Sequence, residues 1–232
     1  YSAKVLKGKG TLYVGAYSYL CEEADASLQA KIDFYTQQGK RVLAVGFRQE
    51  ETIDSSDAMS IIALVVIQDE MRKNAKEIIA YFKKQNIQVC MISGDDPKTV
   101  ASLAKMAGVD NSEHYVDVSR SYESMDALAA NYTIFGRVRP EEKKQLVCAM
   151  QKQGKIVLMS GDGVNDVPAL KVADVSISIK DASSAAKNTA NIILMDNDFS
   201  KIPSIVNEGR RVINNISRAS SMYLVKTVFS FL

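Results

Sequence analysis

The sequence predicts an α/β fold in which a parallel sheet carries helices on both faces, preceded by a partial antiparallel α+β unit. From about Met59 onward, short apolar runs of strand length alternate with segments of helical periodicity. The runs are apolar almost throughout, as in strands that are buried on both faces. This alternation is typical of a Rossmann-like parallel sheet with helices on both faces.

Residues 1–56 have a different pattern, which resembles part of an antiparallel module. Gly8-Lys9-Gly10 lies between two short β-rich runs and predicts a hairpin turn. The polar segment Gln49–Asp57 is expected to link this unit to the main domain. The predicted elements are strands at Ala3–Val5, Thr11–Val14 and Arg41–Phe47, with a helix at Ser27–Gln37.

The main domain is expected to cover residues 57–200. Helix boundaries are marked by Gly108, a typical C-terminal residue, and by Pro140, which suits a first helical position followed by two glutamates. The predicted strands are Ile61–Ile67, Ile87–Ile92, Tyr115–Val118, Tyr132–Phe135, Ile156–Met159, Asp174–Ile179 and Asn191–Leu194. The predicted helices are Asn74–Gln85, Pro97–Ala107, Tyr122–Ala130, one from Pro140 and one from Ser183.

Composition limits the possible classes of protein. The 232 residues are 47% hydrophobic, which is enough for one sizeable core with a smaller second unit. The net charge of +2, with acids and bases interspersed, does not indicate a nucleic-acid surface. The three cysteines are widely spaced and predict neither a zinc site nor a disulfide framework. The sequence begins at Tyr1 and ends at Leu232 within an apolar run, so we expect it to be a fragment.

Two glycine-containing loops carry the predicted chemistry. Ser93-Gly94-Asp95 and Ser160-Gly161-Asp162 each follow an apolar strand, and ligands bind at the carboxyl ends of such strands. The second loop continues through Asn165 and Asp166 into a helix. Carboxylate oxygens are ligands for magnesium, and glycines let the backbone approach a phosphoryl group closely. Asp-Gly and Asn-Asp pairs also occur in ordinary turns, but an ordinary turn does not need this residue order from Met159 to Lys171.

The run Met159–Lys171 closely resembles the hinge motif of P-type cation-transporting ATPases, with Ser160 in place of the usual Thr. The resemblance implies a haloacid-dehalogenase-like phosphorylation domain. It identifies Asp162 as the magnesium ligand and places Asp166 with it at the metal site, where Asp166 and Asn165 support the metal and phosphate geometry. Ser93-Gly94-Asp95 is similar to the family's Thr-Gly-Asp motif. Lys143 follows an Arg-Val-x-Pro stretch and would neutralise phosphate charge.

Other segments resemble the nucleotide-binding parts of the same family. Arg41 opens a strand that resembles the one whose arginine meets ATP phosphates, although a surface arginine before a core strand is an alternative reading. Asp69-Glu70-Met71-Arg72 resembles the interdomain hinge, without the family's proline. Arg137, in the Arg-Val-x-Pro stretch, is also expected to be a cofactor-binding residue. Val14 replaces the lysine that usually lies beside the adenine.

The segment 201–232 is expected to form a stalk helix that runs into a truncated transmembrane segment. Its first half is polar and basic, and Met222–Leu232 is almost entirely apolar. A spanning helix needs about 20 apolar residues, so this run cannot cross a membrane alone. The preceding basic residues suit a cytoplasmic flank.

The resemblance implies an ATP-driven cation pump of the cell membrane, with this region on the cytoplasmic side and with ATP and Mg²⁺ as cofactors. Its cargo would be a divalent cation such as calcium. The nucleophilic Asp-Lys-Thr-Gly-Thr motif is absent from the sequence, so the chain alone is predicted to be inactive. A haloacid-dehalogenase-type phosphatase and a non-catalytic nucleotide- or magnesium-binding module remain alternatives.

Overall fold

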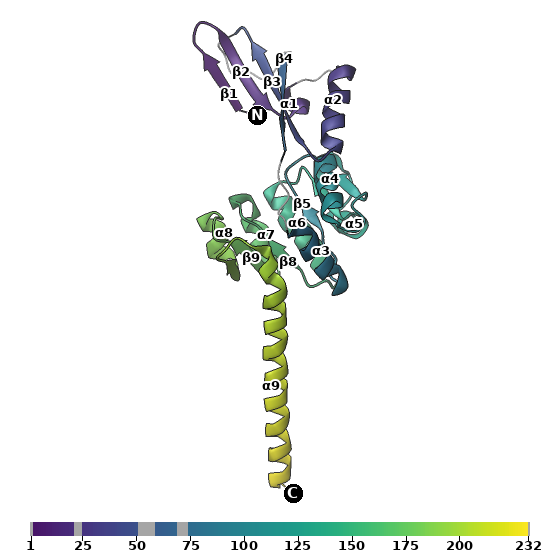
Figure 1. Cartoon of the computed structure of the whole chain (residues 1–232), viewed down its shortest axis with the longest axis vertical. Coiled ribbons are helices and arrows are strands. Elements are labelled where there is room, and N and C mark those ends of the chain that lie inside the picture. Colours follow the sequence, from purple (N-terminus) through teal and green to yellow (C-terminus); the bar gives the residue numbers. More distant parts are fainter. Residues whose placement is uncertain (1, 21–24, 51–58, 69–73, 232) are drawn as a thin grey trace. The chain divides into compact units, whose positions relative to one another are not determined.

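The computed structural model describes residues 2–20, 25–50, 59–68 and 74–231 (Figure 1). Contacts between residues divide the chain into two compact units, and each unit combines segments that are distant in sequence. The first unit contains residues 1–72 and 89–142, and the second contains residues 73–88 and 143–232.

The first unit begins with a four-stranded antiparallel sheet in the order β1-β2-β3-β4. The hairpin predicted around Gly8 is confirmed, because Leu6 pairs with Gly10 and the strands run antiparallel from there. Tyr13, fully buried, lies at the centre of a small core that includes Tyr17 and Ala44. The elements are β1 (Ser2–Leu6), β2 (Gly10–Gly15), α1 (Tyr17–Leu20), α2 (Ala26–Gln37), β3 (Arg41–Arg48) and β4 (Ser60–Ile67).

The strand β4 corrects one prediction. The apolar run Ile61–Ile67 was expected to open the parallel sheet, but it pairs antiparallel with β3, from Arg41 opposite Ile67 to Phe47 opposite Ser60. The prediction was wrong because an uninterrupted apolar run indicates a strand without indicating its partner. The antiparallel sheet therefore extends beyond the polar segment that was expected to end it.

The rest of the first unit is a parallel sheet in the order β5-β7-β6. Helix α4 packs against β6 and β7. Asp96 accepts a hydrogen bond from the Lys98 amide at the start of α4, and Gly108 ends this helix with φ 87°. The elements are β5 (Met91–Ile92), α4 (Pro97–Ala107), β6 (Tyr115–Asp117), α5 (Met125–Asn131) and β7 (Ile134–Gly136).

The second unit contains another parallel sheet, in the order β10-β9-β8. Its core includes Ile177 and Leu170, and Phe82 of α3 packs against it. Helices α7 and α8 pack against β9 and against each other. The elements are α3 (Ala75–Lys84), α6 (Pro140–Lys152, of which 140–142 belong to the first unit), β8 (Leu158–Ser160), α7 (Val167–Val172), β9 (Val175–Ile179), α8 (Ser184–Thr189), β10 (Ile192–Leu194) and α9 (Ile202–Phe231).

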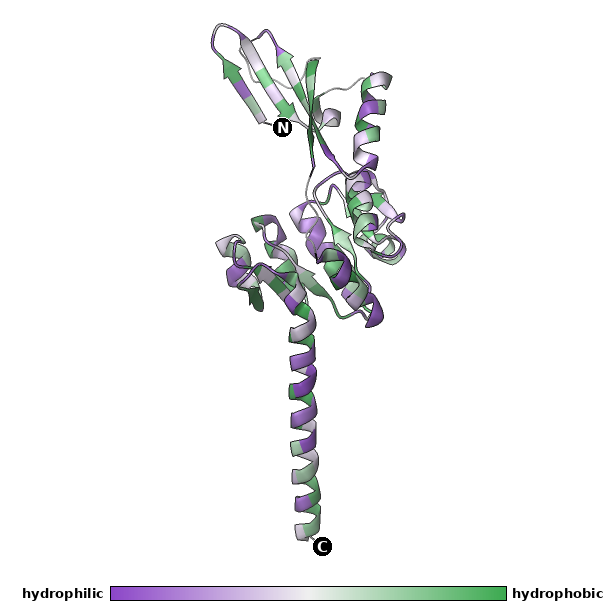
Figure 2. Ribbon diagram, in the orientation of Figure 1, coloured by the Kyte–Doolittle hydropathy of each residue, from purple (hydrophilic) through white to green (hydrophobic). Residues whose placement is uncertain are grey.

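The predicted C-terminal helix is α9, which is 30 residues long and exposed from Asn207 onward over its described side chains. Figure 2 shows hydrophilic residues along its first half and hydrophobic residues toward its C-terminal end. Within the part of the chain that the structure describes, no helix combines the length and hydropathy needed to cross a bilayer.

The predicted fold class is confirmed. Parallel strands alternate with helices that cover them, and an antiparallel α+β unit precedes them. The described parallel strands pair as two groups of three, where a single sheet was expected.

Candidate functional site

The turn after β8 is held in a single tight conformation. The Gly161 amide donates to the Ile177 carbonyl at 3.2 Å, which extends the β8–β9 ladder by one residue. A Cβ atom at Gly161 would lie 2.5 Å from the Cβ of Asp166. Real side chains do not approach this closely, so the turn requires glycine at this position.

Behind this turn lies a buried ion pair. Lys143 of α6 and Asp166 are 8% and 9% exposed, and the Lys143 Nζ lies 2.7 Å from the Asp166 Oδ1. The other oxygen, Oδ2, accepts a hydrogen bond from the Gly163 amide at 3.1 Å. Both oxygens of Asp166 therefore have partners, which offsets the cost of burying its charge.

Asp162 and Asn165 differ from Asp166 because both are exposed. Among the described residues, neither side chain has a hydrogen-bond or ion-pair partner. Magnesium commonly binds proteins through one or two carboxylates, with water and substrate phosphate completing its shell. An exposed, unpartnered carboxylate at Asp162 fits that role. Among the described residues no three His, Cys, Asp or Glu side chains cluster as a metal cage.

The loop after β5 is fixed by backbone hydrogen bonds to the end of β7. The Ser93 amide donates to the Phe135 carbonyl at 2.9 Å, and the Val138 amide donates to the Ser93 carbonyl at 3.0 Å. The Ser93 hydroxyl accepts a hydrogen bond from the Asp95 amide at 3.1 Å. Hydrogen bonds therefore join this loop to the segment that contains Arg137, at the carboxyl ends of the neighbouring strands β5 and β7.

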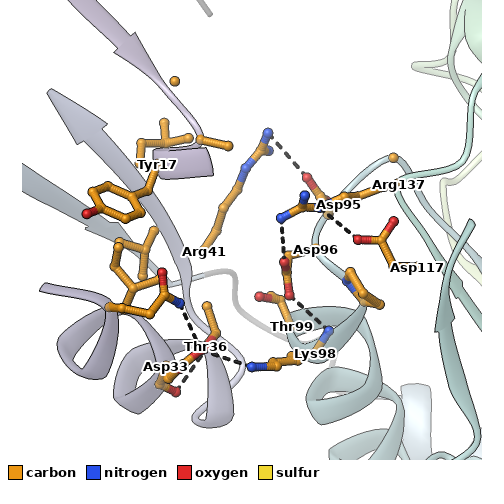
Figure 3. Close-up of a pocket in the computed structure, with 18 of the residues that line it drawn as sticks. Tyr17, Asp33, Thr36, Arg41, Asp95, Asp96, Lys98, Thr99, Asp117 and Arg137 are labelled. Carbon is orange, nitrogen blue, oxygen red and sulfur yellow. Dashed lines mark hydrogen bonds and ion pairs between the residues drawn. The ribbon is translucent and has the colours of Figure 1, made fainter. Parts of the chain in front are cut away.

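Two arginines connect this feature to carboxylates. Arg137 lies 2.9 Å from Asp96 and 3.6 Å from Asp117, and its backbone has a φ of 52°. Arg41 points toward Asp95 at 3.2 Å, and both side chains are about half exposed (Figure 3). The arginines of the nucleotide-side prediction are thus paired with acids of the same unit.

The same residues border a cavity of about 1170 Å³ within the first unit (Figure 3). Val14 and the neighbouring Gly15-Ala16-Tyr17 line one side, and the loop from Gly94 to Lys98 lines another. Lys98, which also lines the cavity, donates a hydrogen bond from its Nζ to Asp33, and this bond raises the pKa of Lys98. The charged lining residues are four acids and four bases: Asp33, Asp95, Asp96, Asp117, Arg41, Lys98, Arg120 and Arg137.

The structure thus brings the predicted residues together in two groups. Lys143, Asp162, Asn165 and Asp166 belong to the second unit. The first unit holds Ser93, Gly94, Asp95, Arg41 and Arg137. Asp69 and Arg72, predicted on the nucleotide side, lie outside the described residues.

Sequence reasoning missed Asp96 and Asp117, the two partners of Arg137. A signal for each was present, because Asp96 precedes the proline of a helix start and Asp117 lies near the carboxyl end of the predicted strand Tyr115–Val118.

Comparison with known proteins identifies the family. A family model described as haloacid dehalogenase-like hydrolase matches residues 3–174. The chain therefore belongs to the haloacid dehalogenase-like hydrolases. The resemblance to P-type cation-transporting ATPases that the motifs predicted is also confirmed by similar proteins.

Two bacterial proteins are similar along nearly the whole chain. The probable cation-transporting ATPase exp7 of Streptococcus pneumoniae is 36% identical over 237 residues, which cover 100% of this chain and 30% of that protein. The calcium-transporting ATPase CtpE of Mycolicibacterium smegmatis is 38% identical over 229 residues, with 96% and 28% covered. The chain thus spans less than a third of the length of these relatives.

A solved structure shares the fold. A zinc-transporting PIB-type ATPase in its E2.Pi state aligns with a TM-score of 0.61 at 20% identity, covering 94% of this chain and 31% of that one.

Proposed function

We propose that this chain is part of an ATP-driven cation pump that works through a phosphorylated aspartate, which residues outside this sequence would supply. The observation that carries the proposal is the turn after β8, where the exposed Asp162 lies beside the buried Lys143–Asp166 pair. The similarity to cation-transporting ATPases, which extends over the antiparallel unit and the terminal helix, supports it.

Within this proposal the residues of the turn have separate roles. Asp162 would hold Mg²⁺, which supplies positive charge beside the phosphoryl oxygens. Asp166 would support the metal site through Lys143 and the Gly163 amide, which its two oxygens position, while Asn165 is exposed and free to contact phosphate. Lys143 keeps further N–H donors beyond the one directed at Asp166, and these can neutralise a phosphoryl group.

On the first unit, Ser93, Gly94 and Asp95 would orient the phosphoryl group. Arg41 and Arg137 border the cavity and would contact the nucleotide phosphates. A phosphate that binds Arg41 must compete with Asp95, and Val14 offers no charge to a nucleotide. Weak binding of ATP by this chain follows from these two features. Asp69 and Arg72 are proposed as a hinge between nucleotide and phosphorylation domains.

We propose a division into three parts, a nucleotide-binding part that extends through β4, a phosphorylation domain, and the helix α9 as a stalk. The stalk would join membrane-spanning segments of a longer protein, with this region on the cytoplasmic side. The transported ion would be a divalent cation, with calcium favoured by the name of the mycobacterial relative.

The proposal is tested in the full-length pump by replacing Asp162 with Asn. This change keeps the shape of the side chain and removes its charge. Phosphoenzyme formation from γ-labelled ATP should fall at least tenfold (about 1.4 kcal/mol or more) at ordinary magnesium, with partial recovery at high magnesium.

An unchanged magnesium dependence would contradict the metal role, because asparagine also substitutes well for an aspartate that only supports a turn. If the wild-type protein took up no label from ATP and had phosphatase activity, the alternative phosphatase function would be favoured.

A further inference from the structure

The strand β9 carries two buried serines that none of the proposed steps uses. Ser176 is 1% exposed and Ser178 is 0% exposed, and they lie on the same strand two residues apart. A buried hydroxyl is costly unless it forms hydrogen bonds, so each should have a specific partner.

The two serines have different partners. The Ser176 hydroxyl donates to the Asn191 Oδ1 at 2.8 Å and accepts from the Asn191 amide at 3.1 Å, which ties β9 to the residue before β10. The Ser178 hydroxyl donates to the Gly161 carbonyl at 2.9 Å. Only Ser178 therefore reaches the turn after β8.

The Gly161 carbonyl belongs to the peptide group that connects Gly161 with Asp162. The next peptide group, between Asp162 and Gly163, is held on both sides. Its carbonyl accepts from the Ser183 amide at 2.8 Å, and its N–H donates to Asp166 at 3.1 Å. The two peptide planes on either side of Asp162 define its φ and ψ, so these contacts fix the backbone from which the exposed carboxylate projects.

We propose that Ser178 is a positioning residue for the magnesium site, acting through the Gly161 carbonyl to preorganise Asp162. The inference rests on the proposed role of Asp162 as a magnesium ligand. Without the hydroxyl, the Gly161 carbonyl loses its side-chain donor, and the peptide plane between Gly161 and Asp162 can rotate. Magnesium would then have to order the turn when it binds, which lowers its affinity.

Ser176→Ala is the matched control for Ser178→Ala. Both changes remove one hydroxyl from an almost fully buried serine of β9. Each also leaves the hydrogen-bonding partner of that hydroxyl without its contact. Ser176→Ala breaks two side-chain hydrogen bonds and Ser178→Ala breaks one, so the control should lose at least as much stability. Thermal unfolding shows whether each variant is folded and how much stability each has lost. Only Ser178→Ala should change magnesium binding.

The test uses backbone amide NMR signals of this 232-residue chain, titrated with MgCl₂ at constant ionic strength. In the wild type, amides of Gly161 to Val164 should shift with magnesium, and Asp162→Asn should remove that response. Ser178→Ala should weaken the fitted affinity about three- to tenfold, as expected for one lost hydrogen bond. Ser176→Ala should stay within about twofold of the wild type.

The outcomes distinguish the inference from the proposal beneath it. A wild-type turn that does not respond to magnesium overturns both the metal site and the role of Ser178. If the wild type responds and both serine variants bind magnesium as tightly as the wild type does, only the positioning role is overturned. Equal weakening in both serine variants also overturns it, because the effect would then follow lost stability.

Discussion

At the residue scale, the buried Lys143–Asp166 pair is expected to be sensitive to substitution. Lys143→Met keeps a long apolar stem and removes the charge, which leaves the Asp166 carboxylate buried without its cation. Breaking one side of a buried pair is costly, so we expect a loss of about 3–5 kcal/mol in the free energy of unfolding. Urea denaturation followed by circular dichroism measures this loss.

Lys171→Met on α7 is the control for this prediction, because Lys171 is exposed and has no partner among the described residues. Its effect should stay within about 0.5 kcal/mol. Adding Asp166→Asn to Lys143→Met should recover part of the loss, since no charge is then stranded. Equal losses for the two lysines would show that the buried pair contributes nothing specific.

Gly136, the last residue of β7, is a second site that tolerates little change. A Cβ atom there would lie 2.5 Å from the backbone of Pro97, which begins α4. Gly136→Ala must push the strand end away from the helix start, so we expect a loss of about 1–3 kcal/mol in stability. Thermal unfolding checks this, with Gly94→Ala as control because a Cβ atom there would lie 3.9 Å from the Val138 carbonyl oxygen, an ordinary contact distance.

At the scale of elements, the start of β8 depends on a carboxylate. The Val157 amide donates to Asp174 at 2.8 Å, and this hydrogen bond, with a further one from Gln151, lowers the pKa of Asp174. The folded state therefore holds the ionised form more tightly than the unfolded state does. The resulting stabilisation is complete above the usual pKa of 3.8 and disappears as the pH falls through the lower folded value.

Asp174→Asn tests this linkage, because asparagine retains an acceptor for the Val157 amide and cannot titrate. The variant should lose less stability than the wild type when urea midpoints are compared between neutral pH and pH values below about 4. Parallel curves for the two proteins would show that Asp174 does not contribute to acid sensitivity.

Most elements were predictable because their signals are local. The Asp96-Pro97 start and Gly108 end of α4, and the Ser183 start of α8, depend on residues within one turn of the boundary. The partner of β4 was not predictable, because pairing with β3 depends on contacts between segments distant in sequence. The four-residue helix α1 was also missed, since it is too short to show a helical period.

The same distinction applies to the candidate site. The loop sequences indicated where carboxylates and glycines would lie, and both loops do follow parallel strands. Partner choice was not visible, because Arg137 and Asp117 approach each other only through sheet packing. Likewise, the sequence did not show that Asp166 is buried and Asp162 exposed.

At the scale of the whole molecule, the 232-residue chain should not form an acyl-phosphate. It presents the turn with Asp162 and Lys143, but it lacks the Asp-Lys-Thr-Gly-Thr motif that would accept the phosphoryl group. Incubation with γ-labelled ATP and magnesium should leave no label that survives acid and is released by hydroxylamine. The full-length pump is the positive control, and stable label on the chain alone would contradict the prediction.

Asp166 binds both Lys143 and the Gly163 amide, so the two residues of the ion pair cannot exchange places. In an ordinary salt bridge, exchanging the two residues can preserve the attraction. Here a lysine at position 166 could not accept the Gly163 amide hydrogen bond, and an aspartate at position 143 is too short to replace the reach of the lysine. Charge reversal would therefore restore neutrality and still open the turn. Both residues of this pair can be replaced together by uncharged ones, but the lysine and the aspartate cannot be exchanged.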